Sequence, residues 1–163
     1  LSCMNAGIIR RLGFQSGMRS FSAAGAKSIA GATWTNILTI RSVTSFQSRT
    51  NKIHAELISF LGAVDGTKNG DLRILKNATL GGTPSWAAVD SVSSVMEYDT
   101  AGTTITGGEL RLPVPLNKAG TASLVIKNQF AYIDIHPGDS ITAAAYSANA
   151  SDINVGLSWI EFF

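Results

Sequence analysis

A two-residue hydrophobic period, repeated along the body of the chain, constrains its fold more than any other feature. It is clearest at residues 109–116, where Leu110, Leu112, Val114 and Leu116 alternate with Glu109, Arg111, Pro113 and Pro115. Successive side chains of a β-strand point to opposite faces of a sheet, so this spacing predicts a strand with one buried face. The two prolines cannot donate ladder hydrogen bonds, which predicts that this strand lies at a sheet edge.

Further segments of this kind follow one another, separated by turn sequences. Strands are predicted over residues 34–41, 53–61, 71–77, 89–98, 123–127, 130–135, 141–146 and 153–163. Turn clusters such as Asp65-Gly66 and His136-Pro137-Gly138-Asp139 interrupt them. The first two strands are expected to pair with each other. Eight or nine short strands without a helix between them predict an all-β fold, an antiparallel β-sandwich that is jelly-roll-like.

The first 31 residues differ in composition from the rest. They are rich in Gly, Ser and Ala, and no regular element can run far between Gly7, Gly13, Gly17, Gly25 and Gly31. Such a segment cannot bury enough apolar surface alone to offset its chain entropy. We therefore expect an extended, basic N-terminal arm at residues 1–31 and a β-sandwich domain at residues 32–163.

Charge is also divided along the chain. Residues 1–55 hold seven basic residues and no acidic one, whereas residues 56–163 hold six basic residues and all eleven acidic ones. A basic arm on an acidic body suits binding to nucleic acid or to an acidic protein, such as another copy of the chain. Protein contact is favoured, because four basic residues in the arm are sparse beside the tracts that bind phosphate backbones. A solvated tail without a partner is the remaining alternative. The predicted anchoring residues are Arg10, Arg11, Arg19 and Lys27.

The residues that could suggest catalysis or metal binding are better explained as parts of turns and strand ends. The chain has no nucleophile elbow, no phosphate-binding glycine loop and no Cys–His couple. Asp134 and His136 share one strand face and suit a metal, but a turn at 136–139 accounts for them more simply. The close carboxylates Glu97 and Asp99 are interpreted as solvated acids near a strand end. We predict no enzyme activity, no catalytic residue, no cofactor and no metal.

Two other features limit the possible roles. The single cysteine, Cys3, cannot form a disulfide within the chain, and no run of about 18 apolar residues predicts a membrane span. Asn77-Ala78-Thr79 and Asn149-Ala150-Ser151 match the glycosylation acceptor pattern, and we interpret both as turns. Of the three tryptophans, Trp159 is predicted to lie in the core, whereas Trp86 is expected near the surface as the possible ligand-facing residue.

Residues 73–163 resemble a domain of tailed-bacteriophage virion proteins, among them tail-fibre, head-fibre and capsid-decoration components. The resemblance rests on residues 75–80 (LKNATL), 84–86 (PSW), 95–100 (VMEYDT), 136–142 (HPGDSIT) and 157–159 (LSW). It covers a little over half of the chain, and the first 30 residues are among those that lie outside it. It implies a virion structural subunit, commonly a trimer, that is assembled in the host bacterial cytoplasm and works without cofactor or catalysis.

Three functions are therefore expected, in order of preference. The first is a phage capsid decoration (cement) protein that its N-terminal arm anchors, because the chain has no fibre shaft of repeats or coiled coil. The second is a receptor- or carbohydrate-binding fibre tip that binds through Trp86 and the loops at one end of the sandwich. The third is a shell-forming viral coat protein whose arm meets packaged nucleic acid. The expected partners are other virion subunits, either capsid or fibre proteins, and further copies of the chain.

Overall fold

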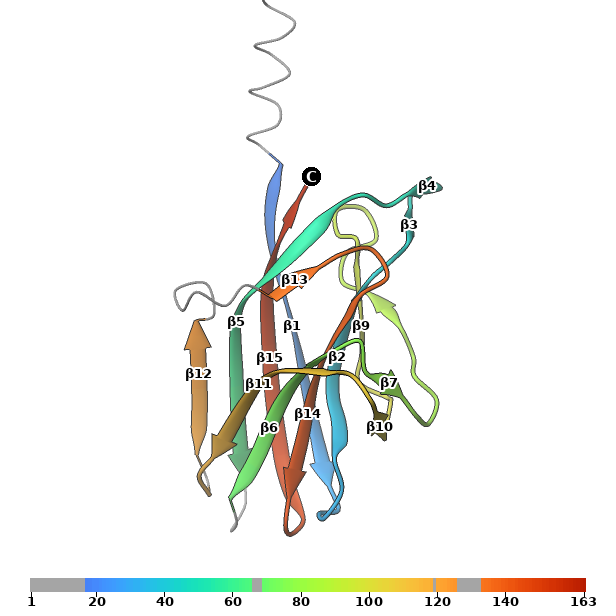
Figure 1. Ribbon diagram of the computed structural model, residues 1–163. Helices are drawn as coiled ribbons and strands as arrows, with labels where there is room; N and C mark the ends of the chain where they lie inside the picture. The colour runs from blue at the N-terminus through green and yellow to red at the C-terminus, as the bar shows by residue number, and fades with distance from the viewer. Residues whose placement is uncertain (1–16, 66–68, 119, 126–132) are drawn as a thin grey trace, which may run out of the picture.

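The computed structural model describes residues 17–65, 69–118, 120–125 and 133–163. In this part of the chain every regular element is a strand. Most of the strands form two large, packed antiparallel sheets (Figure 1), and two short ribbons, β3-β4 and β7-β10, lie outside them. The strands are β1 (Met18–Ile29), β2 (Thr35–Ser42), β3 (Ser45–Phe46), β4 (Arg49–Thr50), β5 (His54–Asp65), β6 (Gly70–Lys76), β7 (Thr79–Leu80), β8 (Ala87–Ala88), β9 (Met96–Asp99), β10 (Ile105–Thr106), β11 (Glu109–Leu116), β12 (Thr121–Val125), β13 (Ile133–Ile135), β14 (Ser140–Ser147) and β15 (Ser151–Phe162). The predicted all-β, antiparallel sandwich is confirmed.

The order of strands in the two sheets identifies the topology. Sheet A has the order β1-β15-β5-β12, with β13 also paired to β5, and sheet B has the order β11-β6-β14-β2-β9-β8. Strand β1 pairs with β15, β2 with β14, β5 with β12 and β6 with β11, all antiparallel. The chain is thus one long antiparallel ribbon in which the first strand pairs with the last. The ribbon is rolled into two sheets, and this arrangement is the jelly-roll topology. The jelly-roll expectation is confirmed, and β11 lies at the sheet edge that its prolines predicted.

The hydrophobic core lies between the two sheets. Its largest fully buried side chains include Trp159, Phe60, Leu38 and Leu72, and Trp159 is the core residue that its alternation predicted. Strands β2 and β14 are buried on both faces. Their outer faces are covered because the connection between β6 and β11 packs back on sheet B, where its Asp99 bonds to Asn36 of β2.

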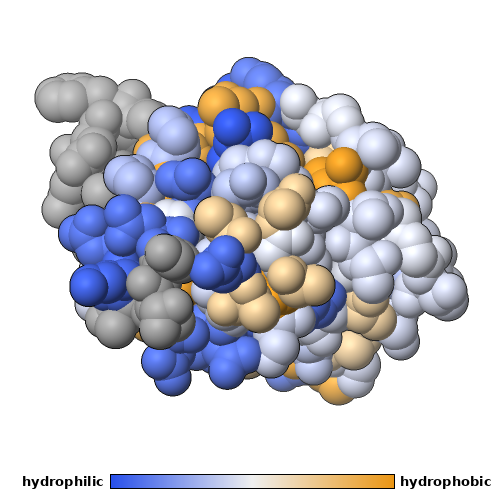
Figure 2. All heavy atoms as spheres, turned by 90° about the horizontal axis from the view of Figure 1, so that it is seen from below, coloured by the Kyte–Doolittle hydropathy of each residue, from blue (hydrophilic) through white to orange (hydrophobic). Residues whose placement is uncertain are grey.

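The two ends of the sandwich differ. The β1–β2, β5–β6, β11–β12 and β14–β15 connections are three to five residues long and lie at the lower end of Figure 1. Figure 2 views this end, where hydrophilic residues gather on one side and residues of intermediate hydropathy cover much of the rest. At the opposite end, Phe163 donates its N–H to the carbonyl of Gly17 at 2.7 Å. The described chain therefore starts and ends side by side.

The predicted arm is wrong over residues 18–29. This segment is β1, which pairs residue by residue with β15 along its whole length. Phe21, Ala23 and Ile29 face the core, whereas Ser22 and Ala24 face outward. Because Ala, Gly and Ser differ little in hydropathy, the two-residue period is faint in the sequence. The prediction of an arm now applies to residues 1–16, which lie outside the described residues.

Two further strand predictions need correction. Strands β2 and β5 were expected to pair but lie in different sheets, because the connection between them crosses from sheet B to sheet A. The strand predicted over 89–98 is restricted to β9, since the Asp90 carboxylate accepts hydrogen bonds from the N–H groups of Val92 and Ser93 and holds a turn there. Residues 126–132 of the two strands predicted before the 136–139 turn lie outside the described residues.

Gly25 is required where β1 approaches β2. A Cβ atom at this position would lie 2.6 Å from the backbone carbonyl oxygen of Ile37. We expect Gly25→Ala to lower the free energy of unfolding by about 1–3 kcal/mol, because the backbone of β1 must move away from β2. Gly156→Ala is the control, since its Cβ would meet only the Leu61 Cβ at an ordinary 3.7 Å. Equal urea midpoints for the two variants would contradict this prediction.

Candidate functional site

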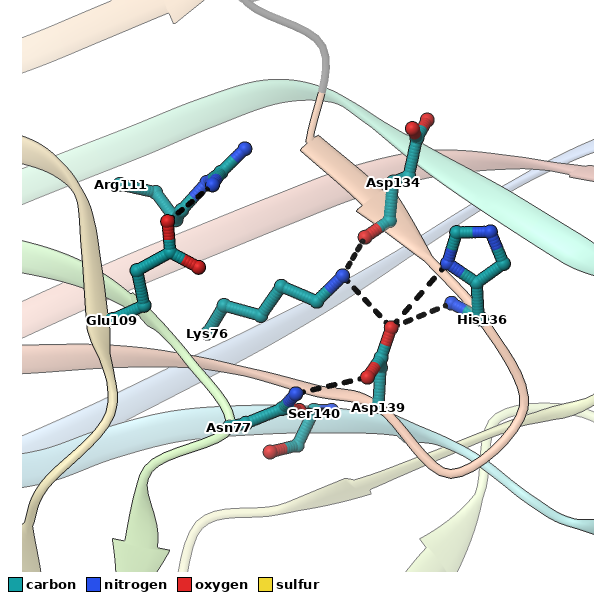
Figure 3. Close-up of polar contacts among 8 residues, drawn as sticks. All are labelled: Lys76, Asn77, Glu109, Arg111, Asp134, His136, Asp139 and Ser140. Atoms are coloured by element: carbon teal, nitrogen blue, oxygen red, sulfur yellow. Dashed lines mark hydrogen bonds and ion pairs between the residues drawn. The ribbon is translucent and has the colours of Figure 1, made fainter.

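The first polar cluster joins the end of β6 to the turn before β14 (Figure 3). The Asp139 carboxylate accepts hydrogen bonds from Lys76 Nζ at 2.8 Å, Asn77 Nδ2 at 2.9 Å and the His136 N–H at 3.0 Å. Asn77, whose φ is 57°, accepts the Ser140 N–H through Oδ1 at 2.9 Å. The predicted turn at residues 136–139 is thus present, and the side chains of Lys76, at the end of β6, and of Asn77, which follows it, hold it in place.

This cluster has no arrangement that suits a cation. Lys76 Nζ lies between the Asp139 carboxylate and the backbone carbonyl of Asp134, to which it donates at 2.8 Å, so an ammonium group already occupies the position. Figure 3 shows the Asp134 carboxylate directed away from Lys76. Within the described ranges, no group of three or more His, Cys, Asp or Glu side chains is placed to hold a metal ion. The two glycosylation patterns also differ here, since the amide of Asn77 is bonded within the cluster while Asn149 is exposed.

Because of Asp139, we expect the fold to lose stability as the pH falls into the acid range. Partial burial raises the pKa of its carboxyl, but hydrogen bonds from Lys76, Asn77 and the His136 N–H, together with the Lys76 charge, lower it more, so the pKa falls from 3.8 to about 2. A lowered pKa in the folded state stabilises the fold above pH 3.8, and this contribution is lost as the pH falls from about 4 to about 2.

We expect Asp139→Asn to lower the free energy of unfolding at neutral pH by about 1 kcal/mol, a modest value because solvent screens the carboxylate. The loss of stability between pH 4 and pH 2 should be shallower in this variant than in the wild type. Urea unfolding at a series of pH values measures both effects. Asp134→Asn serves as the control, and an equal change in slope for the two variants would count against the assignment to Asp139.

Asp99 is the centre of a second, buried cluster. Its carboxylate accepts Asn36 Nδ2 at 3.1 Å and the N–H groups of Ser85, Ala101 and Gly102 at 2.6, 3.2 and 2.9 Å. The interpretation of Asp99 as a solvated acid is wrong, because the residue is fully buried. The sequence does not reveal this, since the four donors come from three separate segments. Asp99 fixes the β6–β11 connection against sheet B.

Glu161 is the centre of a third cluster; its carboxylate is fully buried and was not identified from the sequence. It accepts Ser94 Oγ at 2.6 Å, the Val95 N–H at 2.9 Å and Trp159 Nε1 at 2.9 Å. A signal was present, because Glu161 continues the inward-facing series that includes Trp159. Glu161 fastens the loop before β9 to the last strand of sheet A. All three clusters thus hold connections in place through charge-assisted hydrogen bonds.

Two of the four predicted anchoring residues have partners within the chain. Arg19 Nη1 donates to the Ser93 carbonyl at 3.2 Å, and its guanidinium lies 4.8 Å from the centre of the Phe163 ring. Lys27 Nζ donates to the Gly102 carbonyl at 2.7 Å, and burial lowers its pKa despite the opposing effect of Asp99. Both side chains reach from β1 to the loops of sheet B and close the sandwich along this edge. Arg10 and Arg11 lie outside the described residues.

The tryptophans are not gathered into one platform. Trp159 is buried, as predicted. Trp86 is half-buried, and the Arg41 guanidinium lies 3.9 Å from its ring centre while Arg41 Nη2 pairs with Glu97 at 2.7 Å. Trp34 has the Arg73 guanidinium at 4.0 Å and also contacts Tyr146. An arginine therefore covers one face of each half-buried tryptophan, and Trp86 offers a ligand at most its other face.

Among the described residues, no helix is long and apolar enough to cross a membrane. No protein-family model matches the chain, and no curated protein matches it. Among solved structures, a chain of the Nora virus structure aligns with 16% sequence identity and a TM-score of 0.27, over 90% of this chain and 60% of that chain. The chain thus spans less than two thirds of the length of the Nora virus chain. At this TM-score the alignment does not bear on the fold, which the strand order identifies by itself.

Proposed function

We propose that the chain is a non-enzymatic structural subunit of a virion, and within the virion a phage capsid decoration (cement) protein. The observation that carries this proposal is the jelly-roll order of the strands, because viral capsid and lectin domains use this architecture. A fold alone does not specify a function, so the polar sites must support the same conclusion. The resemblance of residues 73–163 to phage virion proteins is a separate line of support.

The carboxylates support a structural role over catalysis. Asp99, Glu161 and Asp139 each accept at least three hydrogen bonds from groups of the same chain. A general acid or base needs a carboxyl group that can reach a substrate and exchange its proton near the working pH. These carboxylates instead hold the long connections at fixed positions, which suits a surface that must fit neighbouring subunits.

Arg10 and Arg11 are the basic residues of the N-terminal segment, and we propose that they contribute to anchoring. They precede β1 and are followed by Arg19, which binds within its own chain. The proposed partners are other virion subunits, and the proposed oligomer is a trimer. A shell-forming coat protein is the second candidate, favoured by the combination of a jelly roll with a basic segment ahead of its first strand.

The molar mass of the full chain in solution, measured by light scattering at low and high salt, separates the two candidates. We expect a trimer for a decoration protein, whereas a closed particle of many copies would establish the coat protein. Sedimentation with undecorated capsids of the same virus then tests decoration directly. The full chain should co-sediment and a chain lacking residues 1–16 should not. A folded full chain that stays in the supernatant would contradict the decoration role.

A further inference from the structure

No described segment covers the outer face of sheet A. The outer face of sheet B, in contrast, is covered by the connection between β6 and β11. Its cross-strand rows consist of small or uncharged side chains, namely Ser22, Ser158 and Ser59, then Ala24, Gly156 and Leu61, then Ala26, Asn154 and Ala63. Leu61 is 52% exposed and lines an apolar groove with Ala24, Ala26 and Gly156. A flat, apolar groove on an exposed sheet face is a surface that a partner can cover.

Acidic residues stand in pairs at both ends of this groove. Asp65 lies directly opposite Asp152 in the register of β5 and β15, and Glu56 lies directly opposite Asp134 in the register of β5 and β13. Like charges placed opposite each other on a sheet are destabilising. Asp152 accepts a hydrogen bond from Ser28, yet within the described ranges none of the four forms an ion pair. Lys27, which lies beside Asp65 and Asp152, donates to Gly102 instead.

The negative charge on the outer face of sheet A limits which kind of partner can bind there. The same face of a second copy would bring four acids against four acids, so face-to-face pairing is disfavoured. A suitable occupant is cationic and partly apolar. Residues 1–16 of the chain have this character, because they contain Arg10 and Arg11, no acidic residue, and apolar side chains that include Ile8, Ile9, Leu12 and Phe14.

We propose that residues 1–16 of one copy dock in the acid-flanked groove on sheet A of another copy. An extended segment of this length reaches about 50 Å, enough to cross the face of a neighbouring sheet. Docking on its own sheet would require the segment to reverse direction, because β1 runs from Gly17 along the same sheet toward the opposite end. The proposal concerns copies of this chain alone and holds whether or not the function proposed above is correct.

An exchange of charges between full-length chains tests this proposal. One variant carries Arg10→Glu and Arg11→Glu, and the other carries Asp65→Lys and Asp152→Lys. Each variant alone should bind itself at least about tenfold more weakly than the wild type, since like charges then meet in the groove. An equimolar mixture should associate again, because each variant supplies a segment whose charge complements the groove of the other. Analytical ultracentrifugation measures all three samples, and the wild-type association should weaken with salt.

Asp71→Lys is the matched control, because Asp71 is an exposed acid of sheet B near the same end of the sandwich. It should leave self-association unchanged, and circular dichroism confirms that each variant is folded. A wild type that stays monomeric overturns the proposal, as does a mixture that associates no better than its components. Because capsids are absent from this experiment, its failure is distinguishable from a failure to decorate virions.

Discussion

Deletion of residues 1–30 is expected to leave a chain that no longer folds, whereas deletion of residues 1–16 should leave both sheets intact. The longer deletion removes all of β1, so β15 loses its partner along twelve residues and becomes an exposed edge. It also removes the core residue Ile29 and the ring of Phe21, which stacks on Trp159 with 6.4 Å between ring centroids. We expect a loss of more than about 5 kcal/mol, comparable with the whole stability of a domain of this size.

Circular dichroism and thermal unfolding of the two deleted chains measure this difference. The chain starting at Gly17 should melt cooperatively near the temperature of the full chain. The chain starting at Gly31 should show no cooperative transition, and its tryptophan fluorescence should indicate exposure of Trp159. A cooperative transition in the shorter chain would show that β1 is dispensable and would restore the prediction of an arm over residues 1–31.

Glu161→Ala is expected to cause a large loss of stability for a single substitution of a polar residue. Three buried donors, Trp159 Nε1, Ser94 Oγ and the Val95 N–H, lose their acceptor together. Each unsatisfied buried donor costs about 1–3 kcal/mol, and breaking a buried charged network typically costs about 3–5 kcal/mol. We therefore expect a loss of about 3–5 kcal/mol. Glu161→Gln should cost less, because one amide oxygen remains as an acceptor.

Urea unfolding measures these losses, with Glu109→Gln as the control. Glu109 pairs with Arg111 on the surface and its side chain is 64% exposed, so its substitution should cost less than about 1 kcal/mol. Amide hydrogen exchange at Val95 provides a local measurement, because this N–H should lose protection in both Glu161 variants. If Glu161→Ala unfolds at the same urea concentration as Glu109→Gln, the buried network contributes no stability.

Local pattern was enough to identify those strands whose two faces differ strongly in hydropathy. Strand β11 has the predicted bounds and the predicted edge position, because leucine and valine alternate with charged residues and proline. The same reasoning placed Trp159 in the core. It failed for β1, in which serine, alanine and glycine give little contrast between the faces. The contacts of Arg19 with Ser93 and of Lys27 with Gly102 were therefore not predicted.

The polar sites could be predicted only where their members are neighbours in the sequence. The turn at residues 136–139 was predicted because its proline, glycine and aspartate are adjacent. The buried cluster of Asp99 was not, because its donor Asn36 is 63 residues away. Glu161 had a usable signal in its phase with Trp159, but its partner Ser94 is 67 residues away. The burial of these acids depends on partners that no local pattern identifies.

The sequence by itself determined that the body of the chain consists of strands, the sandwich class, the edge position of β11 and the division of charge between the two parts of the chain. Only the tertiary structure decided which strands pair, that Met18 lies opposite Phe162, and that two pairs of acids face each other on sheet A. The physical reason is that side-chain alternation is a property of neighbouring residues, whereas strand pairing is a choice among distant segments. That choice depends on the packing of the whole core.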